Sequence, residues 1–160
     1  MLESRSFEVQ FKGIHSLVLP DKEISAFIEN GHKRVKVTAT FEGNSVEFHA
    51  ALQKRGTEYR MMFGKDHQKA LGIFPNDYII LQLFEDRSKY GVIMPEELKA
   101  VLESDVEALK IFESFTDGKK RSIIYMIAKY KASQTRIDKS ILLCENLKRG
   151  ISKPPDLLKS

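Results

Sequence analysis

Between Thr116 and Gly150 the apolar residues recur at the spacing of an α-helix, and this pattern constrains the fold more than any other feature of the sequence. The first apolar face consists of Ile123, Ile124, Ile127 and Tyr130, and the second of Ile137, Ile141, Cys144 and Leu147. Residues 132–134 interrupt the pattern, Thr135 to Asp138 fit a capping box, and Gly150 suits a C-cap. The stretch therefore predicts two short helices that pack antiparallel.

Positive charge is concentrated in the same part of the chain. Residues 116–160 hold 11 Lys and Arg against 4 Asp and Glu, whereas residues 1–115 hold 15 against 18. Such segregation is typical of a surface for nucleic acid or for an acidic partner. The competing and commoner interpretation is a solvated basic face on packed helices. Arg136 opposes the dipole of its helix, so we expect a carboxylate or a carbonyl of the preceding helix to hold it.

The first half of the chain alternates apolar and polar residues, which is typical of half-buried strands. Strands are expected near residues 7–12, 14–19, 34–41, 46–52, 59–63 and 78–84, and short helices near 20–28 and 65–71. An offset of 44 residues superposes strand, short helix, glycine and strand on a second copy of the same order. Two such units predict a six-stranded β-barrel with two short helices, although alternating strands also resemble one another by chance.

The pattern changes after residues 86–88. Pro95 suits the first position of a helix with Leu98 and Leu102 on its apolar face, and Ser104 to Glu107 fit a second capping box. The predicted fold is therefore α+β, with a β-barrel domain over residues 1–90 and a small all-α domain over 95–150. Residues 151–160 are expected to form a loosely ordered tail.

The helical region resembles the C-terminal domain of the bacteriocin-protection, YdeI/OmpD-associated family. The residues that carry this resemblance are Pro95, Leu98, Leu102, Phe112, Phe115, Gly118, Lys120, Arg121, Ile127, Lys131, Thr135, Arg136 and Lys139. Ser133-Gln134 stands where many relatives have Pro-Glu, and Tyr130 where they often have alanine. The candidate residues for binding an anion or a partner are Lys119, Lys120, Arg121, Lys131, Thr135, Arg136 and Lys139.

The first half resembles the double-split β-barrel of AbrB-like transcription factors, and also the barrel domain of unknown function that precedes the bacteriocin-protection domain. The matching residues are Phe7, Pro20, Val35, Val37, Gly43, Leu71, Gly72, Asp77 and Leu83. Asn76 replaces the glycine that many relatives have before the last strand. Asparagine tolerates the left-handed backbone that such a turn requires.

The sequence offers little to build a catalytic or cofactor site. Its four histidines are widely separated, and it contains no phosphate-binding glycine loop and no nucleophile-elbow motif. His67 is expected on a solvated helix face and His49 on the outer surface of a strand. Cys144, the single cysteine, is expected to be a buried thiol, which is consistent with a reducing cytoplasm. We therefore expect no enzyme, no cofactor and no metal. The N-terminus lacks a secretory core and no apolar run spans a bilayer, so neither a signal peptide nor membrane insertion is expected.

Two functional interpretations are open. The resemblance to the bacteriocin-protection family implies a bacterial cytoplasmic interaction protein that contributes to tolerance of antimicrobial peptides or stress through a protein partner. The second is a nucleic-acid-binding module that uses an AbrB-like barrel and the basic C-terminal helices. Lys33, Arg34, Lys36, Lys54 and Arg55 would add to its positive surface. Fold similarity alone does not decide between them.

Overall fold

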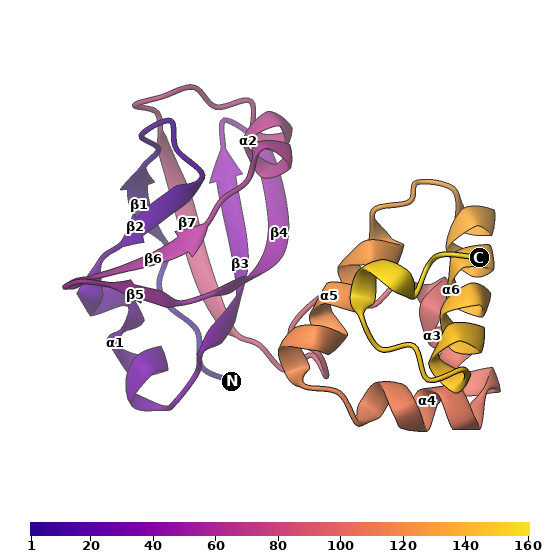
Figure 1. Cartoon of the computed structure of the whole chain (residues 1–160). Helices are drawn as coiled ribbons and strands as arrows, with labels where there is room; N and C mark the ends of the chain where they lie inside the picture. The colour runs from indigo at the N-terminus through magenta and orange to yellow at the C-terminus, as the bar shows by residue number, and fades with distance from the viewer. The chain divides into compact units, whose positions relative to one another are not determined.

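The computed structural model describes residues 1–160 and divides into two compact units, Met1–Gly91 and Val92–Ser160 (Figure 1). The first unit holds all seven strands and two short helices, α1 (Asp21–Glu29) and α2 (Lys65–Leu71). The second unit holds α3 (Glu96–Ser104), α4 (Val106–Glu113), α5 (Asp117–Ala128), α6 (Ser133–Lys148) and the 3-10 turn η1 (Pro154–Asp156). The chain is thus a mixed α+β protein with its strands N-terminal and its larger helices C-terminal. None of its helices is both long enough and apolar enough to cross a membrane.

The strands form two antiparallel sheets. The four-stranded sheet has the order β1 (Phe7–Gln10), β7 (Tyr78–Glu85), β3 (Arg34–Phe41) and β4 (Asn44–Ala51). The three-stranded sheet has the order β2 (Ser16–Leu19), β6 (Glu58–Met62) and β5 (Gln53–Arg55). Alternate residues of every strand except β5 turn toward one apolar core, in which Phe27, Phe63 and Leu81 are fully buried. The alternation read in the sequence therefore marks the buried face correctly.

The single six-stranded barrel expected from the sequence is not confirmed. The chain passes directly from the four-stranded sheet to the three-stranded sheet at two corners, where a short stretch around Gly13 separates β1 from β2 and Leu52 alone separates β4 from β5. Gly13 has a φ of +82°, a conformation that glycine adopts readily. These corners divide the strands between two open sheets, and no ladder joins the sheets into one closed ring.

The 44-residue offset seen in the sequence relates real elements of the first unit. It carries β2 onto β6, α1 onto α2 and β3 onto β7. The equivalent strands also pair with each other, because β2 is antiparallel to β6 and β3 is antiparallel to β7. This mutual pairing is consistent with two copies of one strand–helix–strand unit.

The helical unit corrects several details of the sequence interpretation. Helix α6 begins at Ser133 with Ala132 as its N-cap, so Thr135 is not a capping residue. Asp105, rather than Ser104, caps α4 by accepting a hydrogen bond from the amide of Ala108. Pro95 precedes α3 as its N-cap instead of occupying its first turn. Helix α6 begins three residues before its predicted start, and α3 and α4 each begin one residue after theirs.

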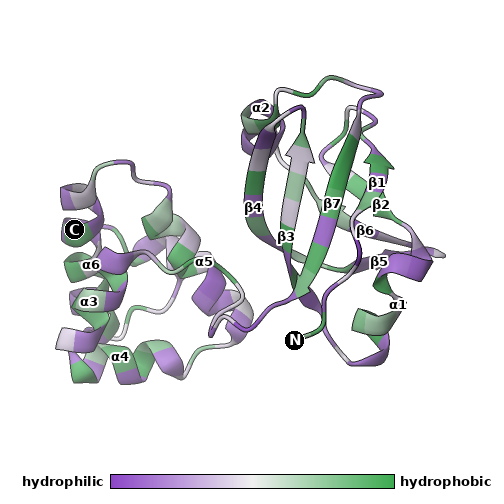
Figure 2. Ribbon diagram, turned by 180° about the vertical axis from the view of Figure 1, so that it is seen from behind, coloured by the Kyte–Doolittle hydropathy of each residue, from purple (hydrophilic) through white to green (hydrophobic).

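The buried face of α6 also differs from the predicted stripe. Ile141 is 45% exposed, whereas Leu143 and Ser140 are fully buried beside Cys144 and Leu147. Figure 2 shows hydrophilic and hydrophobic residues interspersed along α6, so hydropathy alone marks its inner face poorly. Cys144 is 3% exposed, as predicted, and burial raises the pKa of its thiol to about 11. Cys144 is therefore a packed side chain and not an activated nucleophile.

Residues 151–160 are not the loose tail that the sequence suggested. Leu157 and Leu158 are buried against the helices, and the side chain of Asn146 donates hydrogen bonds to the carbonyls of Leu157 and Lys159. Asn146 is itself 1% exposed. A buried amide on α6 thus fixes a segment whose sequence, rich in Pro and Lys, gave no sign of packing.

Candidate binding surfaces of the helical unit

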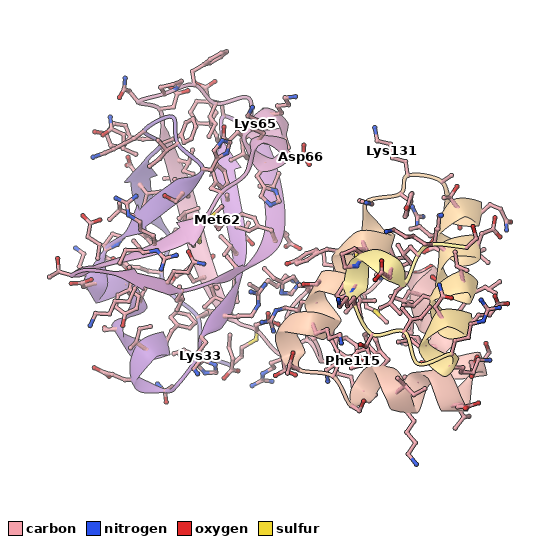
Figure 3. The ribbon with its side chains drawn as sticks, in the orientation of Figure 1. Lys33, Met62, Lys65, Asp66, Phe115 and Lys131 are labelled. Carbon is pink, nitrogen blue, oxygen red and sulfur yellow. The ribbon has the colours of Figure 1, made fainter.

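The candidate residues lie on α5, on the connection that follows it, and on the first two turns of α6. Helix α5 begins where Thr116 accepts a hydrogen bond from the amide of Lys119 at 3.3 Å. Its 12 residues make it about 18 Å long. Figure 3 shows Lys131 at one end of this helix and Phe115 at the other. The structure therefore separates the seven candidates into two groups, one near each end of α5.

The first group, Lys119, Lys120 and Arg121, is not a uniform exposed patch. The ammonium of Lys119 lies 3.9 Å from the centre of the Phe115 ring, a cation–π contact. Lys120 is only 12% exposed and lies 3.6 Å from both Glu113 and Asp117. Lys120 is thus a structural residue, and its reversal to glutamate would place like charges together inside the unit. Arg121 is half-buried and belongs to no ion pair.

The second group gathers around the α5–α6 connection. Arg136 donates to the carbonyls of Tyr130 and Lys131 at 2.7 and 2.9 Å and pairs with Glu97 of α3 at 2.7 Å. A carbonyl and a carboxylate thus hold this cation at a helix N-terminus, as predicted, but the carboxylate comes from α3 and the carbonyls follow the end of α5, instead of belonging to the preceding helix. The guanidinium closes the turn between α5 and α6 and joins it to α3.

The carboxylate of Glu97 is engaged in hydrogen bonds within the helical unit. The hydrogen bond from Arg136, a backbone amide and a hydrogen bond from Ser133 together lower its pKa to about 2, against an opposing contribution from burial. Glu97 therefore stays ionised at neutral pH and neutralises Arg136. This pair is part of the packing of the unit and leaves no free charge for a ligand.

Three lysines remain beside this pair without a carboxylate partner. Lys129 and Lys131 are exposed, and the ammonium groups of Lys129 and Lys139 lie 5.5 and 5.9 Å from the centre of the Tyr130 ring. Lys139 also donates to the carbonyl of Leu158 at 3.4 Å. Thr135 lies one turn before Lys139 on α6 and is partly exposed. We name Lys129, Lys131, Thr135 and Lys139 the connection cluster; Lys129 is a member that the sequence analysis did not single out.

The charge segregation in the sequence has a structural explanation. Residues 92–115 hold 2 Lys and Arg against 6 Asp and Glu, and they pack against the basic residues 116–160 in one unit. Ion pairs join the two parts: Glu97 with Arg136 at 2.7 Å, Asp105 with Lys148 at 2.7 Å and Glu113 with Lys120 at 3.6 Å. The hydrogen bond from Lys148 and a backbone amide hold the pKa of Asp105 below its usual value. Much of the contrast therefore serves helix packing.

The five basic residues that the sequence analysis named in the strand unit, Lys33, Arg34, Lys36, Lys54 and Arg55, are not all free of partners. Arg34 donates twice to the carbonyl of Gly91, at 3.1 and 3.0 Å, and Lys36 lies 3.6 Å from Glu47. Lys33, Lys54 and Arg55 form no ion pair. Two of these five cations are therefore engaged inside the unit, and three remain for a barrel-based nucleic-acid module.

Two histidines lie in environments that the sequence did not reveal. His49 is not an open surface residue: its side chain is 11% exposed, and Nδ1 lies 2.8 Å from the carboxylate of Asp86. Burial would raise the pKa of Asp86, but hydrogen bonds from Ser88 and His49 lower it overall. His67 stacks on Phe48 with ring centres 4.3 Å apart, and burial lowers its pKa. Both contacts join residues that are far apart in the sequence, so local sequence patterns could not predict them.

Comparison with known proteins relates one part of the chain to a protein family. A model of the bacteriocin-protection, YdeI or OmpD-associated family matches residues 91–150, which is the helical part of this α+β chain. The comparison with curated proteins finds no match. A solution structure of PHS018 from Pyrococcus horikoshii shares 18% identity, with 55% of this chain and 100% of that chain covered, at a TM-score of 0.43. A likeness of that strength supports no conclusion about the fold, so the AbrB-like barrel stays a prediction.

Proposed function

We propose that this chain is a binding protein of the bacteriocin-protection type and that its helical unit docks on an acidic protein surface through the connection cluster. The observation that carries the proposal is that Lys129, Lys131 and Lys139 gather at one end of the unit without a carboxylate partner. Glu97, beside the α5–α6 connection, is paired with Arg136 and does not neutralise these lysines. Net positive charge at the α5–α6 connection favours an acidic partner and increases the rate of its association.

The similarity of residues 91–150 to the bacteriocin-protection family supports a role in bacterial tolerance of antimicrobial peptides or stress. We place that role in the cytoplasm, and we assign the protein no catalytic activity.

A nucleic-acid partner is the second candidate, and one observation on α5 favours it. Arg121, Tyr125 and Lys129 follow one another at intervals of four residues, so they share one helix face with about 6 Å between neighbours. Tyr125 is 53% exposed, and an exposed aromatic ring between two cations suits a stacked base flanked by phosphates. This interpretation depends on α5 alone and no longer on a barrel.

The test compares two probes of similar charge on the full chain. Fluorescence anisotropy is measured with a labelled oligoglutamate peptide and with a random DNA duplex, each at low and moderate salt. The docking proposal predicts that the variant with Lys129, Lys131 and Lys139 changed to glutamate loses at least about tenfold in affinity for the peptide. The matched control changes Lys99, Lys110 and Lys153 to glutamate, and these are three exposed lysines of the same unit without ion pairs. The control variant should lose far less affinity for the peptide.

The outcomes separate the candidates. Equal losses in the two triple variants would show that only net charge matters and would reject the connection cluster. Tighter binding of DNA than of peptide, weakening with salt at a log–log slope of about −0.9 per phosphate contacted and reduced by Tyr125→Ala, would favour the nucleic-acid candidate. Thermal unfolding of each variant verifies that the fold is intact.

A further inference from the structure

A pocket of about 470 Å³ opens in the strand unit between the start of α1 and strand β1. Its apolar lining comes from Phe7, Pro20 and Ile80, and its charged lining includes Arg5 and Glu23. Lys22 and Glu8 add one charge of each sign, so the lining is neutral as it stands. The pocket belongs to the other unit from the connection cluster, so a ligand bound in it would be separate from the acidic partner proposed for the helical unit.

Glu23 is an unusual residue for a helix surface because its side chain is only 5% exposed. Both contacts from Arg5 reach the same oxygen, Oε1, with Nε at 2.8 Å and Nη2 at 2.6 Å. The second oxygen, Oε2, accepts no hydrogen bond, and no buried side-chain oxygen of the structure lacks a partner, so Oε2 keeps some exposure on a residue that lines the pocket. The guanidinium of Arg5 holds the pKa of this carboxyl below its usual value, which keeps a buried negative charge at the pocket floor.

Arg5 covers this charge with a side chain that is itself 67% exposed. The main chain around it is fixed, because Ser4 donates its amide to Leu83 and its hydroxyl accepts the amide of Leu83. The side chain of Arg5 can therefore swing away while the N-terminal segment stays in place. An exposed ion pair is weak, whereas a buried carboxylate left without a cation is costly. Glu23 thus requires a cation, but not that of Arg5 in particular.

We propose that this pocket binds an arginine side chain of an extended peptide segment, which replaces Arg5 at Glu23. Removing the Arg5 head from the lining leaves one net negative charge, and an incoming arginine restores neutrality. The planar guanidinium can also form two parallel hydrogen bonds to both oxygens of Glu23, which Arg5 does not do. Arg5 acts in the free protein as a built-in competitor.

The free edge of β1 explains why the ligand is a peptide. Strand β1 ends the four-stranded sheet, and only β7 pairs with it. Phe11 exchanges backbone hydrogen bonds with the segment before β7. Because this pattern alternates along a strand, the backbone N–H and C=O groups of Phe7 and Val9 point toward β7, and those of Glu8 point away from it. An added strand can bond to this edge while one of its side chains enters the adjacent pocket.

The experiment is an NMR titration of isotopically labelled full-length protein with N-acetyl-Val-Arg-Val-amide. The amide signals of Ser6, Glu8 and Glu23 report binding. Arg5→Ala should bind the peptide about threefold or more tightly, because the internal competitor is gone. Lys12→Ala, which removes an exposed cation after the end of β1, is the matched control for net charge. Glu23→Gln should weaken binding about tenfold.

Two ligand controls complete the design. The peptide with citrulline in place of arginine keeps the shape but carries no charge, and it should not bind. N-acetyl-arginine-amide lacks flanking peptide groups and should bind more weakly than the tripeptide. The proposal is overturned if Arg5→Ala binds no more tightly than Lys12→Ala, if citrulline binds as well as arginine, or if the single amino acid matches the tripeptide. The Arg5 and citrulline results stand even if Glu23→Gln does not fold.

Discussion

The strand unit and the helical unit are each stabilised internally by a different kind of interaction. In the strand unit, backbone hydrogen bonds join every strand to a neighbour. Polar side chains of the strands, such as Arg34 and His49, then bind Gly91 and Asp86 in the segment that follows β7. The helices of the second unit satisfy their backbone internally, so only side chains join them. Buried apolar residues, three ion pairs and the Asn146 amide perform that task.

This difference teaches how to interpret charge along a sequence. An acidic segment followed by a basic segment suggested a surface for an anion, yet the two segments are partners in one helical unit. The charge that remains for a ligand is what these ion pairs leave unneutralised, and the lysines of the connection cluster are part of it. A count by structural unit gives 13 Lys and Arg against 12 Asp and Glu for residues 1–91, and 13 against 10 for residues 92–160. The contrast between the units is small.

The largest expected effect concerns the core of the helical unit. Leu143→Ala should reduce the free energy of unfolding by about 2–5 kcal/mol, because it opens a cavity at a fully buried position. Ile141→Ala, the residue that the sequence pattern placed in the core, should cost under about 1 kcal/mol since it is 45% exposed. Urea denaturation measures both. A loss at Ile141 as large as at Leu143 would contradict the orientation of α6.

A smaller effect is expected at the C-terminal segment. Asn146→Ala removes the donor to two carbonyls and should cost about 1–3 kcal/mol. A chain truncated after Asp156 lacks the residues whose carbonyls Asn146 binds, so the same substitution should cost much less in it. Equal costs in the full and truncated chains, again by urea denaturation, would mean that Asn146 does not act through this segment.

The smallest effect is a change in acid stability. Because the pKa of Glu97 is lowered from 4.5 to about 2, its pairing stabilises the fold fully above pH about 4.5 and is lost as the pH falls toward 2. Glu97→Gln should therefore flatten the dependence of the melting temperature on pH in this range, and Arg136→Ala should do the same. Glu103→Gln, at an exposed carboxylate on the same helix without an ion pair, is the control. An unchanged pH profile in Glu97→Gln would reject the pair as a source of stability.

Several features could be predicted from the sequence by itself. The alternation of apolar residues placed the strands, the offset of 44 residues related β3 to β7, and the helical spacing located α5 with Ile123 and Ile127 inside. The carbonyl and carboxylate around Arg136 were expected from the helix dipole alone. These are local or periodic properties, in which a few neighbouring residues determine the conformation.

Only the tertiary structure decided the rest. The corners at Gly13 and Leu52 divide the strands into two sheets, and this division depends on how the whole core closes. The pairing of His49 with Asp86 joins residues 37 positions apart, and the cover of Arg5 over Glu23 joins residues 18 apart. Such contacts leave no period in the sequence, because each depends on two segments that meet only after the chain has folded. For the same reason the sequence showed the total positive charge but not which lysines lack a carboxylate partner in the folded protein.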